Sequence, residues 1–204
     1  MPTQALFVSI IIAVILQRLF ELRLSQRNAA YILARGGRKH GDNFLAIVKV
    51  LQISWWIAML VEVFWLERPF IPILAAGALL ATVAGQILRY LSMQALGRRW
   101  TLPIITIPDV PVVEDGIYSY LQHPNWLGVI LEIAALPLIH GAYLTAIFFS
   151  IANAFLMGKR LQAEELALIQ DTNYADVFSG RLGFHPSLTK SKQVRKALSR
   201  KRVN

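Results

Sequence analysis

The sequence contains no cysteine, which excludes disulfide bonds, thiolate metal sites and a cysteine nucleophile. Charged residues are scarce as well, at 16% of the 204 residues, against roughly 25% in soluble domains. No metal-ligand spacing and no glycine-rich phosphate loop is present, so we expect no metal site. Hydrophobic residues account for 55% of the chain. This balance indicates a single membrane-embedded domain rather than a water-soluble one.

Acidic residues are few relative to basic ones, 12 against 21, which gives a net charge of +9. In a soluble protein such an excess would suggest nucleic acid as a partner. Here the basic residues lie between and after long apolar runs, so membrane orientation explains them better. We therefore expect a lipid bilayer, and no nucleic acid, as the partner of the basic surface.

Long apolar runs predict an all-α integral membrane protein with about five transmembrane helices. The first run lacks a preceding basic region and a small-residue cleavage site, which favours a membrane helix over a removed signal. Residues 124–158 would greatly exceed the hydrocarbon core of about 30 Å as one helix. Pro137 and His140-Gly141 lie near the middle, so we predict a short helical hairpin that continues as a polar helix to about residue 170. The predicted spans are 3–20, 44–66, 70–93, 124–139 and 142–158.

Basic residues gather on one side of this predicted bundle. The polar loop 21–43 carries five, Arg98 and Arg99 add two, and the sequence after Gly158 carries ten, whereas the opposite side has only Arg68. The N-terminus is therefore expected outside and the C-terminus in the cytoplasm, across the plasma or inner membrane if the protein is bacterial. We divide the chain into three N-terminal helices (1–93), a region with the candidate chemistry (94–186) and a flexible basic tail (187–204). That tail is either a solvated end that sets topology or a contact for anionic lipid.

Charged residues inside the predicted spans require an explanation, because they are rare there and often functional. Arg18, Lys49 and Arg89 lie close enough to helix ends for their charged groups to reach the interface. Glu132 is deeper, and an Arg89–Glu132 pair is a candidate structural tie. We expect His140 to be a turn residue and His185 a loop residue.

The segment 115–128, DGIYSYLQHPNWLG, lies where a loop leads into a membrane helix. Pro124 suits the first helical turn. The free N–H groups of a helix start favour anionic ligand groups, and Tyr118, Tyr120 and Trp126 offer flat faces for a base or a cation. The alternative is a plain helix start with interfacial aromatic rings and a capping histidine.

The segment 159–165, KRLQAEE, lies where the last span leaves the membrane. Arg160 and Glu164 are four residues apart and share one helix face. The alternative is an exposed ion pair worth less than about 1 kcal/mol. If the hairpin forms, His123 and Arg160 lie at its two ends on the same side of the membrane, so the two segments are predicted neighbours.

Together, GIYSYLQHPNWLG and KRLQAEE resemble the isoprenylcysteine carboxyl methyltransferase family and its bacterial relatives, which are membrane enzymes that use S-adenosylmethionine (SAM). The family pattern is Gly-x-Tyr, then Arg-His-Pro and a nearby Gly, and some 30 residues later an Arg with a pair of Glu. The segment 173–186, NYADVFSGRLGFHP, resembles the Tyr…Arg…Phe-x-Pro ending of that family. The resemblance covers about residues 85–186.

The resemblance implies a cytoplasmic SAM pocket and a role for each matching residue. Arg160 would hold the nucleophilic oxygen of the acceptor and Glu164 would bind SAM, with Glu165 as a weaker second acid. His123 would act either as a base or as a residue that orients the cofactor. The pocket-lining residues would be Tyr118, His123, Pro124, Asn125, Trp126 and Glu164, with the backbone of Val112 and Val113.

Two positions depart from the family pattern. Gln122 replaces the usual arginine before His-Pro, so one cation is missing. Trp126 stands where tyrosine is common, which keeps a stacking face but loses a hydroxyl.

The sequence therefore predicts a membrane O-methyltransferase. It would move a methyl group from SAM to a carboxylate or a phenolic or enolic hydroxyl of a lipophilic acceptor, either isoprenylcysteine-like (a prenylated substrate) or alkylpyrone- or alkylresorcinol-like. One alternative is a phospholipid N-methyltransferase, although Arg160 would repel a protonated amine. The other is a non-enzymatic membrane scaffold, which would tolerate changes at His123, Arg160 and Glu164.

Overall fold

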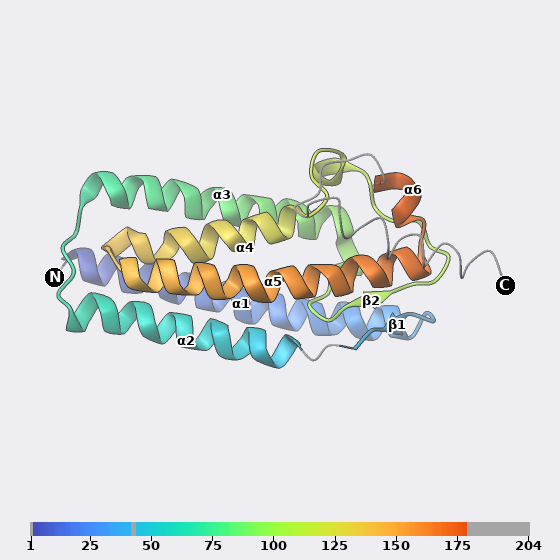
Figure 1. Ribbon diagram of the computed structural model, residues 1–204, viewed down its shortest axis with the longest axis horizontal. Coiled ribbons are helices and arrows are strands. Elements are labelled where there is room, and N and C mark those ends of the chain that lie inside the picture. The colour runs from blue at the N-terminus through green and yellow to red at the C-terminus, as the bar shows by residue number, and fades with distance from the viewer. Residues whose placement is uncertain (1, 42–43, 179–204) are drawn as a thin grey trace.

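The computed structural model describes residues 2–41 and 44–178, and it is a bundle of roughly parallel and antiparallel helices (Figure 1). The predictions for His185, for residues 179–186 and for the tail 187–204 lie outside these residues. The helices are α1 (Pro2–Leu33), α2 (Phe44–Trp65), α3 (Pro72–Leu96), α4 (Pro124–Ala135), α5 (Tyr143–Asp171) and α6 (Tyr174–Phe178), with 3₁₀ turns η1 (Gly97–Arg99), η2 (Gly116–Ser119) and η3 (Leu136–His140). Two short strands, β1 (Arg38–Lys39) and β2 (Ile105–Thr106), pair antiparallel.

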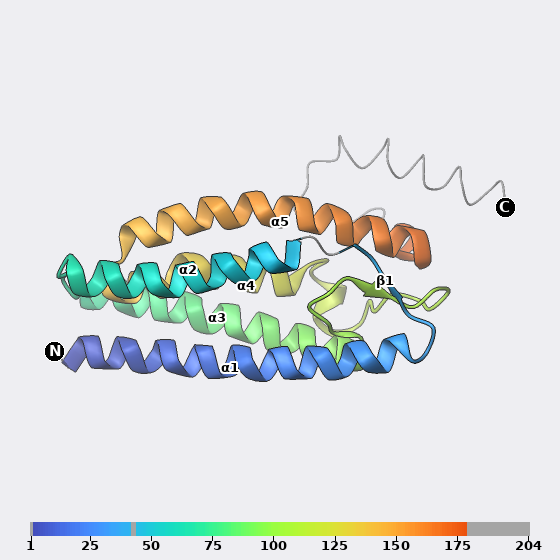
Figure 2. The same cartoon turned by 90° about the horizontal axis from the view of Figure 1, so that it is seen from below.

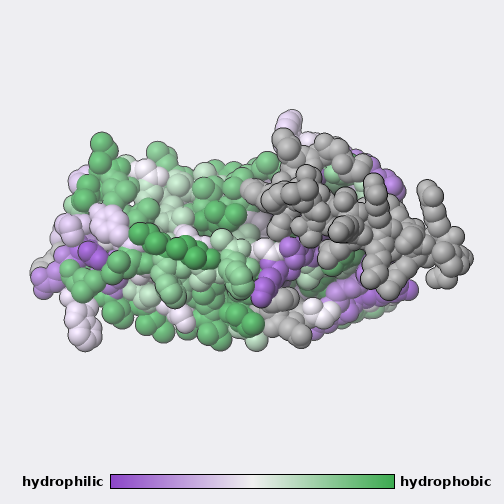
Figure 3. Space-filling model, viewed as in Figure 1, coloured by the Kyte–Doolittle hydropathy of each residue, from purple (hydrophilic) through white to green (hydrophobic). Residues whose placement is uncertain are grey.

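Four of these helices, α1, α2, α3 and α5, are long and apolar enough to cross a membrane. Hydrophobic side chains cover much of the bundle, and hydrophilic ones appear toward its ends (Figure 3). The fourth predicted span, 124–139, is present as α4, which ends at Ala135, and the 3₁₀ turn η3, which continues to His140. The described residues therefore contain four long apolar helices and one shorter apolar segment, 124–140.

The predicted hairpin between α4 and α5 is present, and a carboxylate from another helix fixes its turn. Gly141 adopts a left-handed conformation with φ of 70° just before α5 begins. Glu62 of α2 accepts hydrogen bonds from the N–H groups of Leu144 and Thr145, at 3.0 and 2.7 Å, and from the Thr145 hydroxyl. Arg68 pairs with the same carboxylate at 3.0 Å. Glu62 thus satisfies the free donors at the start of α5 and compensates its own burial.

Helices α3 and α4 approach closely where two glycines face each other. A Cβ atom on Gly128 would lie 2.6 Å from the carbonyl oxygen of Gly85 and 2.6 Å from Cγ of Arg89. Small residues permit such backbone contact between membrane helices. Within the Ala- and Gly-rich α3 this close packing is seen at Gly85, whereas a Cβ on Gly77 would meet no atom within 4 Å.

The first helix is longer than predicted, because α1 continues through the polar segment that was expected to form a loop. Its buried residues keep helical spacing along the whole length; those from Glu21 to Asn28 are polar, and Ile32 near the end is apolar again. The Ser25 hydroxyl accepts from the Leu102 N–H at 2.8 Å, and the Asn28 amide donates to the Trp100 carbonyl at 2.8 Å. A polar inward face therefore extends α1 beyond the apolar run and supports the loop after α3.

The predicted Arg89–Glu132 tie is wrong, since each residue pairs with a different partner. Arg89 donates to Glu21 at 2.5 Å, and Arg18 bridges Glu21 and Glu132. Arg18 therefore does not reach the interface: it lies inside the bundle with a side chain that is only 17% exposed. Burial of two arginines with two glutamates balances their charges, which a bundle interior requires.

At the opposite end of the bundle from Glu62, Asp171 joins three segments. Its carboxylate accepts from Thr106 of β2 and lies 3.0 Å from Nε2 of His40 and 3.4 Å from Arg38 of β1. The end of α5 is thus bonded to the loop that contains β1 and to the loop that contains β2, and both loops lie beside it in Figure 2.

Candidate active site

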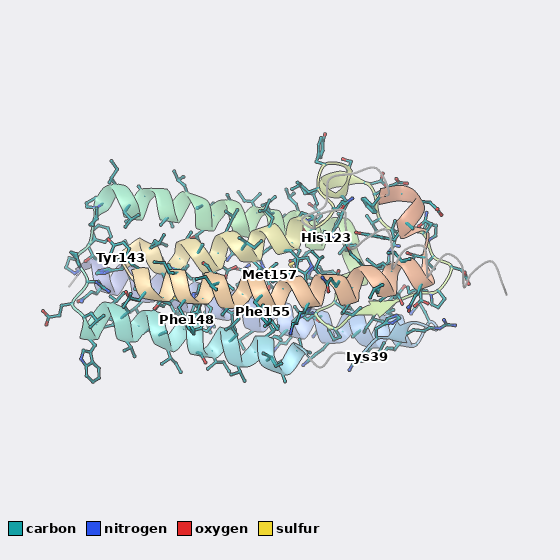
Figure 4. The ribbon with its side chains drawn as sticks, in the orientation of Figure 1. Lys39, His123, Tyr143, Phe148, Phe155 and Met157 are labelled. Atoms are coloured by element: carbon teal, nitrogen blue, oxygen red, sulfur yellow. The ribbon has the colours of Figure 1, made fainter. Side chains whose placement is uncertain are left out.

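The two motifs predicted to be neighbours do meet, at the end of the bundle where α4 begins and α5 leaves the apolar region. His123 lies at the start of α4 next to α5, whereas Tyr143 marks the far end of α5 (Figure 4). Lys39 of β1 lies toward the same end as His123. The hairpin geometry explains this placement, because antiparallel helices bring the start of one beside the end of the other.

Arg160, Trp126 and Glu164 form a connected set across the α4–α5 contact. The guanidinium carbon of Arg160 lies 5.2 Å from the centre of the Trp126 ring, within cation–π range. The Trp126 indole N–H donates to Glu164 at 3.0 Å. The tryptophan that replaces the usual tyrosine therefore supplies both a stacking face and a hydrogen-bond donor.

Arg160 is 5% exposed and is held by the loop that follows α3. One of its terminal nitrogens donates to the carbonyl oxygen of Leu102. Its Nε has no hydrogen-bond partner among the described residues. Because buried guanidinium groups normally use their donors, this arginine retains donor capacity for a ligand oxygen.

His123 belongs to a second buried network, with Glu165 and Tyr174. Nε2 of His123 lies 3.0 Å from Glu165 and 3.2 Å from the Tyr174 hydroxyl, which itself donates to Glu165 at 3.3 Å. Burial raises the pKa of the Tyr174 hydroxyl, and the charges of Glu165 and Glu164 add to the rise, so the phenol stays a neutral donor. This arrangement ties the start of α4 to α5 and α6.

Tyr118 lies in η2 and also lines the site. Burial raises the pKa of its hydroxyl, with a further contribution from the charge of Glu164 and partial opposition from a hydrogen bond with Ser92. Tyr118 is therefore a neutral phenol at physiological pH. Its ring and hydroxyl can contact an aromatic or polar ligand group without adding charge.

The start of α4 offers fewer donors than the sequence indicated. Pro124 has no N–H, and the N–H groups of Trp126 and Leu127 both donate to the His123 carbonyl, each at 3.1 Å. The Asn125 side chain lines the site, and its Oδ1 has no hydrogen-bond partner among the described residues. A ligand is thus met here mainly by side chains, and Asn125 provides an acceptor.

Some residues make contacts at the site that the sequence did not indicate. Asn173 accepts from the N–H of Val112 at 2.9 Å and so fixes the backbone predicted to line the pocket. Gln122, in place of the family's arginine, donates to the Phe178 carbonyl at 3.2 Å and closes the site against α6. Asn173 lies in the segment 173–186 that resembles the family ending, whereas Leu102 carried no sequence signal; the contacts of both depend on tertiary structure.

A cavity of about 800 Å³ connects this site with the interior of the helix bundle. At the site its walls include Tyr118, His123, Trp126, Arg160 and Glu164. Farther inward the walls are largely apolar and come from α1, α2, α4 and α5; they include Ile15, Leu19, Leu45, Ile53, Trp56, Val129 and Leu156. One end of the cavity is suited to a polar ligand and the other to a lipophilic one.

The fold and the site together define a helical membrane protein with a charged, aromatic-lined site at one end of its bundle. Residues 78–170 match the model of the isoprenylcysteine carboxyl methyltransferase (ICMT) family. The chain is 32% identical over 164 residues to the uncharacterized protein YpbQ of Bacillus subtilis (strain 168), across 80% of this chain and 96% of that protein. It is 30% identical over 135 residues to protein-S-isoprenylcysteine O-methyltransferase of Dictyostelium discoideum, across 60% of this chain and 57% of that protein. The chain belongs to the ICMT family, whose members are SAM-dependent methyltransferases.

Proposed function

We propose that this protein is a membrane O-methyltransferase that uses SAM and a lipophilic acceptor. The observation that carries the proposal is the continuous cavity, which joins the Arg160–Trp126–Glu164 set to apolar walls inside the bundle. Methyl transfer to a lipid requires such a space, because a polar cofactor and an apolar substrate must meet with their reacting atoms aligned. The acceptor oxygen would be a carboxylate or a phenolic or enolic hydroxyl.

The residues at the polar end fit the chemical groups of SAM, which would supply an electrophilic methyl group on sulfur. The carboxylate of Glu164 can accept hydrogen bonds from hydroxyl or ammonium groups. Asn125 Oδ1 is a second acceptor, and it has no hydrogen-bond partner among the described residues. Tyr118 and Trp126 offer aromatic faces to a purine or to a positively charged sulfur. Two acceptors and two aromatic faces suit a cationic, nucleoside-containing ligand better than an anion.

Arg160 is the residue that we assign to the acceptor. A guanidinium can bind a carboxylate through two N–H groups, and it favours the ionised form of a phenol or enol. Held by Leu102 and Trp126, Arg160 would keep the nucleophilic oxygen in one position. Such alignment is the main contribution that a protein makes to a displacement reaction.

Helices α1 and α2 provide a route from the bilayer for the acceptor. Leu19, Ile53 and Ile57 line the cavity and are 49–60% exposed. This exposure of apolar lining residues supports an opening of the cavity toward surrounding lipid at this side. With the orientation expected from the basic residues, SAM would enter from the cytoplasm and the acceptor from the membrane.

The geometry favours an oxygen acceptor over the amine of a phospholipid. Arg160 would repel a protonated nitrogen placed beside it, and the only carboxylate in its connected set, Glu164, already accepts from Trp126. The site also argues against a non-enzymatic scaffold. Arg160 has an unused donor and lies where the polar end of the cavity meets its apolar walls, which favours ligand binding over a purely structural role.

The first test is SAM binding by calorimetry in detergent, with the wild-type protein and Glu164→Ala. We expect micromolar binding that the substitution abolishes, together with transfer of label from methyl-labelled SAM to an added long-chain phenol or prenylcysteine. Glu67→Ala, at an exposed site before α3, is the control for loss of a carboxylate. A folded wild-type protein that binds no SAM would refute the proposal.

A further inference from the structure

The inner part of the cavity has a second set of polar side chains, here called the inner polar layer: Arg18, Gln52, Glu132 and Asn153. All four line the cavity, and they come from four different helices, α1, α2, α4 and α5. Polar groups inside a membrane are costly and rare, and those that line a cavity commonly contact a ligand. The inner polar layer therefore indicates a bound ligand, in addition to the contacts that the helices make with one another.

Contacts between the helices place these four side chains at one depth. Trp126 touches Arg160, and from that contact Glu132 lies about 9 Å inward along α4 and Asn153 about 10 Å inward along α5, at 1.5 Å per residue. Arg18 donates to Glu132 and so shares its level. Gln52 and Asn153 are at similar distances, about 15 and 12 Å, from the Glu62–Thr145 contact at the outer end of the bundle.

Several donors and acceptors in this layer lack a protein partner. Oε1 of Glu132, in a residue that is 2% exposed, has no hydrogen-bond partner among the described residues, and neither has Nε2 of Gln52. Arg18 uses two of its nitrogens for Glu21 and Glu132, and its side chain remains 17% exposed. Buried polar groups are normally paired, so a carboxylate acceptor and an amide donor are available for a bound molecule after small side-chain movements.

The buried charges in and behind the layer balance one another; Lys49, which also lines the cavity, is exposed. Arg18 and Arg89 face Glu21 and Glu132, two cations against two anions. An additional ion would disturb that balance at a high electrostatic cost in the bundle interior. The complementary ligand group is therefore uncharged and able to donate or accept hydrogen bonds, as hydroxyl, carbonyl and ether oxygens are.

We propose that the inner polar layer binds a second, uncharged oxygen function of the acceptor, about 10 Å from the oxygen held by Arg160. This inference rests on the proposed function and narrows its substrate class. The acceptor is an amphiphile with an oxygen substituent on its tail or extended head, and Val129, Leu156 and Met157 contact the apolar stretch between the two oxygens. A plain hydrocarbon tail leaves Gln52 and Glu132 desolvated and unpaired, and binds less well.

The test compares two probes that differ by one hydroxyl. The first is a 4-alkylphenol with an unsubstituted tail; the second carries a hydroxyl on the tail about 10 Å from the phenolic oxygen, the depth difference obtained from helix rise. Binding in detergent is followed by tryptophan fluorescence, because Trp56 and Trp126 line the cavity. We expect the hydroxylated probe to bind wild-type protein about threefold more tightly or better, the size of one hydrogen bond inside a membrane protein.

Gln52→Leu and Asn153→Leu should each bring the affinities for the two probes closer together, because each replaces a polar side chain with an apolar one of similar size. Thr82→Val is the matched control: it removes a buried hydroxyl from α3, and Thr82 does not line the cavity. If Asn153→Leu does not fold, Gln52→Met carries the test. Equal or tighter binding of the plain probe by wild-type protein, or a preference that survives both substitutions, overturns the inference.

A SAM titration on the same samples separates the two proposals. If SAM does not bind but the hydroxylated probe is preferred and the variants lose that preference, the methyltransferase proposal fails and the inner polar layer stands as a lipid site. If SAM binds and the preference is absent, only the inner layer is refuted.

Discussion

Trp126 of α4 lies between Arg160 and Glu164 of α5, with its ring 5.2 Å from the arginine and its indole N–H 3.0 Å from the carboxylate. Arg160 and Glu164 are one helical turn apart and could have paired directly. The indole keeps them apart, so the positive group and the negative group can each contact a different ligand.

Trp126→Phe should weaken SAM binding by about tenfold, a typical value for one hydrogen bond to a charged group. The substitution keeps an aromatic face but removes the donor that positions Glu164. Trp126→Tyr, the residue common in the family, is the control because it restores a polar hydrogen. Calorimetry on the three proteins measures the effect; equal affinity in Trp126→Phe would show that Glu164 is positioned by other contacts.

Arg160→Lys should lower the rate of methyl transfer by about a hundredfold and leave the dissociation constant for SAM within about threefold of the wild-type value. Lysine retains the charge but lacks the planar fork, and it loses the bond to Leu102 together with the stacking on Trp126. Single-turnover measurements with labelled SAM separate the two quantities. A larger effect on SAM affinity than on the rate would move Arg160 from the acceptor to the cofactor.

The pH dependence of stability should reveal the buried phenol of Tyr174. Its pKa is raised in the folded protein, so the folded state keeps a proton that the unfolded chain releases near pH 10. This contribution to stability is fully present below about pH 10 and is lost as pH rises through the folded-state value. Melting temperatures at pH 9 and pH 11 should therefore differ less for Tyr174→Phe than for wild-type protein. Tyr120→Phe, which removes an exposed phenol, is the control, and an unchanged pH response in Tyr174→Phe would contradict the assignment.

Gly128→Ala should destabilise the protein by about 1–3 kcal/mol, the usual range for forcing an extra methyl group into a tight contact. The new Cβ would lie 2.6 Å from the backbone of Gly85 and from Arg89, so α3 and α4 would have to separate. Gly77→Ala in α3 is a matched control, because its Cβ would meet no atom within 4 Å and alanine favours the helix. Thermal unfolding in detergent compares them; similar melting temperatures for the two variants would refute the role of Gly128 in packing.

The sequence was sufficient for the parts of the molecule that depend on local pattern. Hydropathy located all of the long apolar helices, and Pro137 with Gly141 located the hairpin turn. The proximity of His123 and Arg160 then followed from the hairpin. The roles of these site residues stay predictions that the experiments above address.

What the sequence did not reveal depends on contacts between distant segments. Arg18 could not be assigned to Glu132 because four charged residues, two on α1 and one each on α3 and α4, allow several pairings, and only the packing of the three helices shows which of them meet. The continuation of α1 was missed because its polar inward face resembles a loop when only hydropathy is considered. Ser25 and Asn28 are buried like core residues. Their hydrogen-bond partners, Leu102 and Trp100, are distant in the sequence and become neighbours only in the fold.

The length of α1 has a mechanical consequence. Its 32 residues span about 48 Å, well beyond a hydrocarbon core of about 30 Å, and Ser25 near its far end holds Leu102, which in turn holds Arg160. A helix adjusts to a thinner or thicker bilayer by tilting. Tilt of α1 would shift Arg160 relative to the start of α4. We therefore expect the rate of methyl transfer to depend on the acyl-chain length of the lipids that surround the protein.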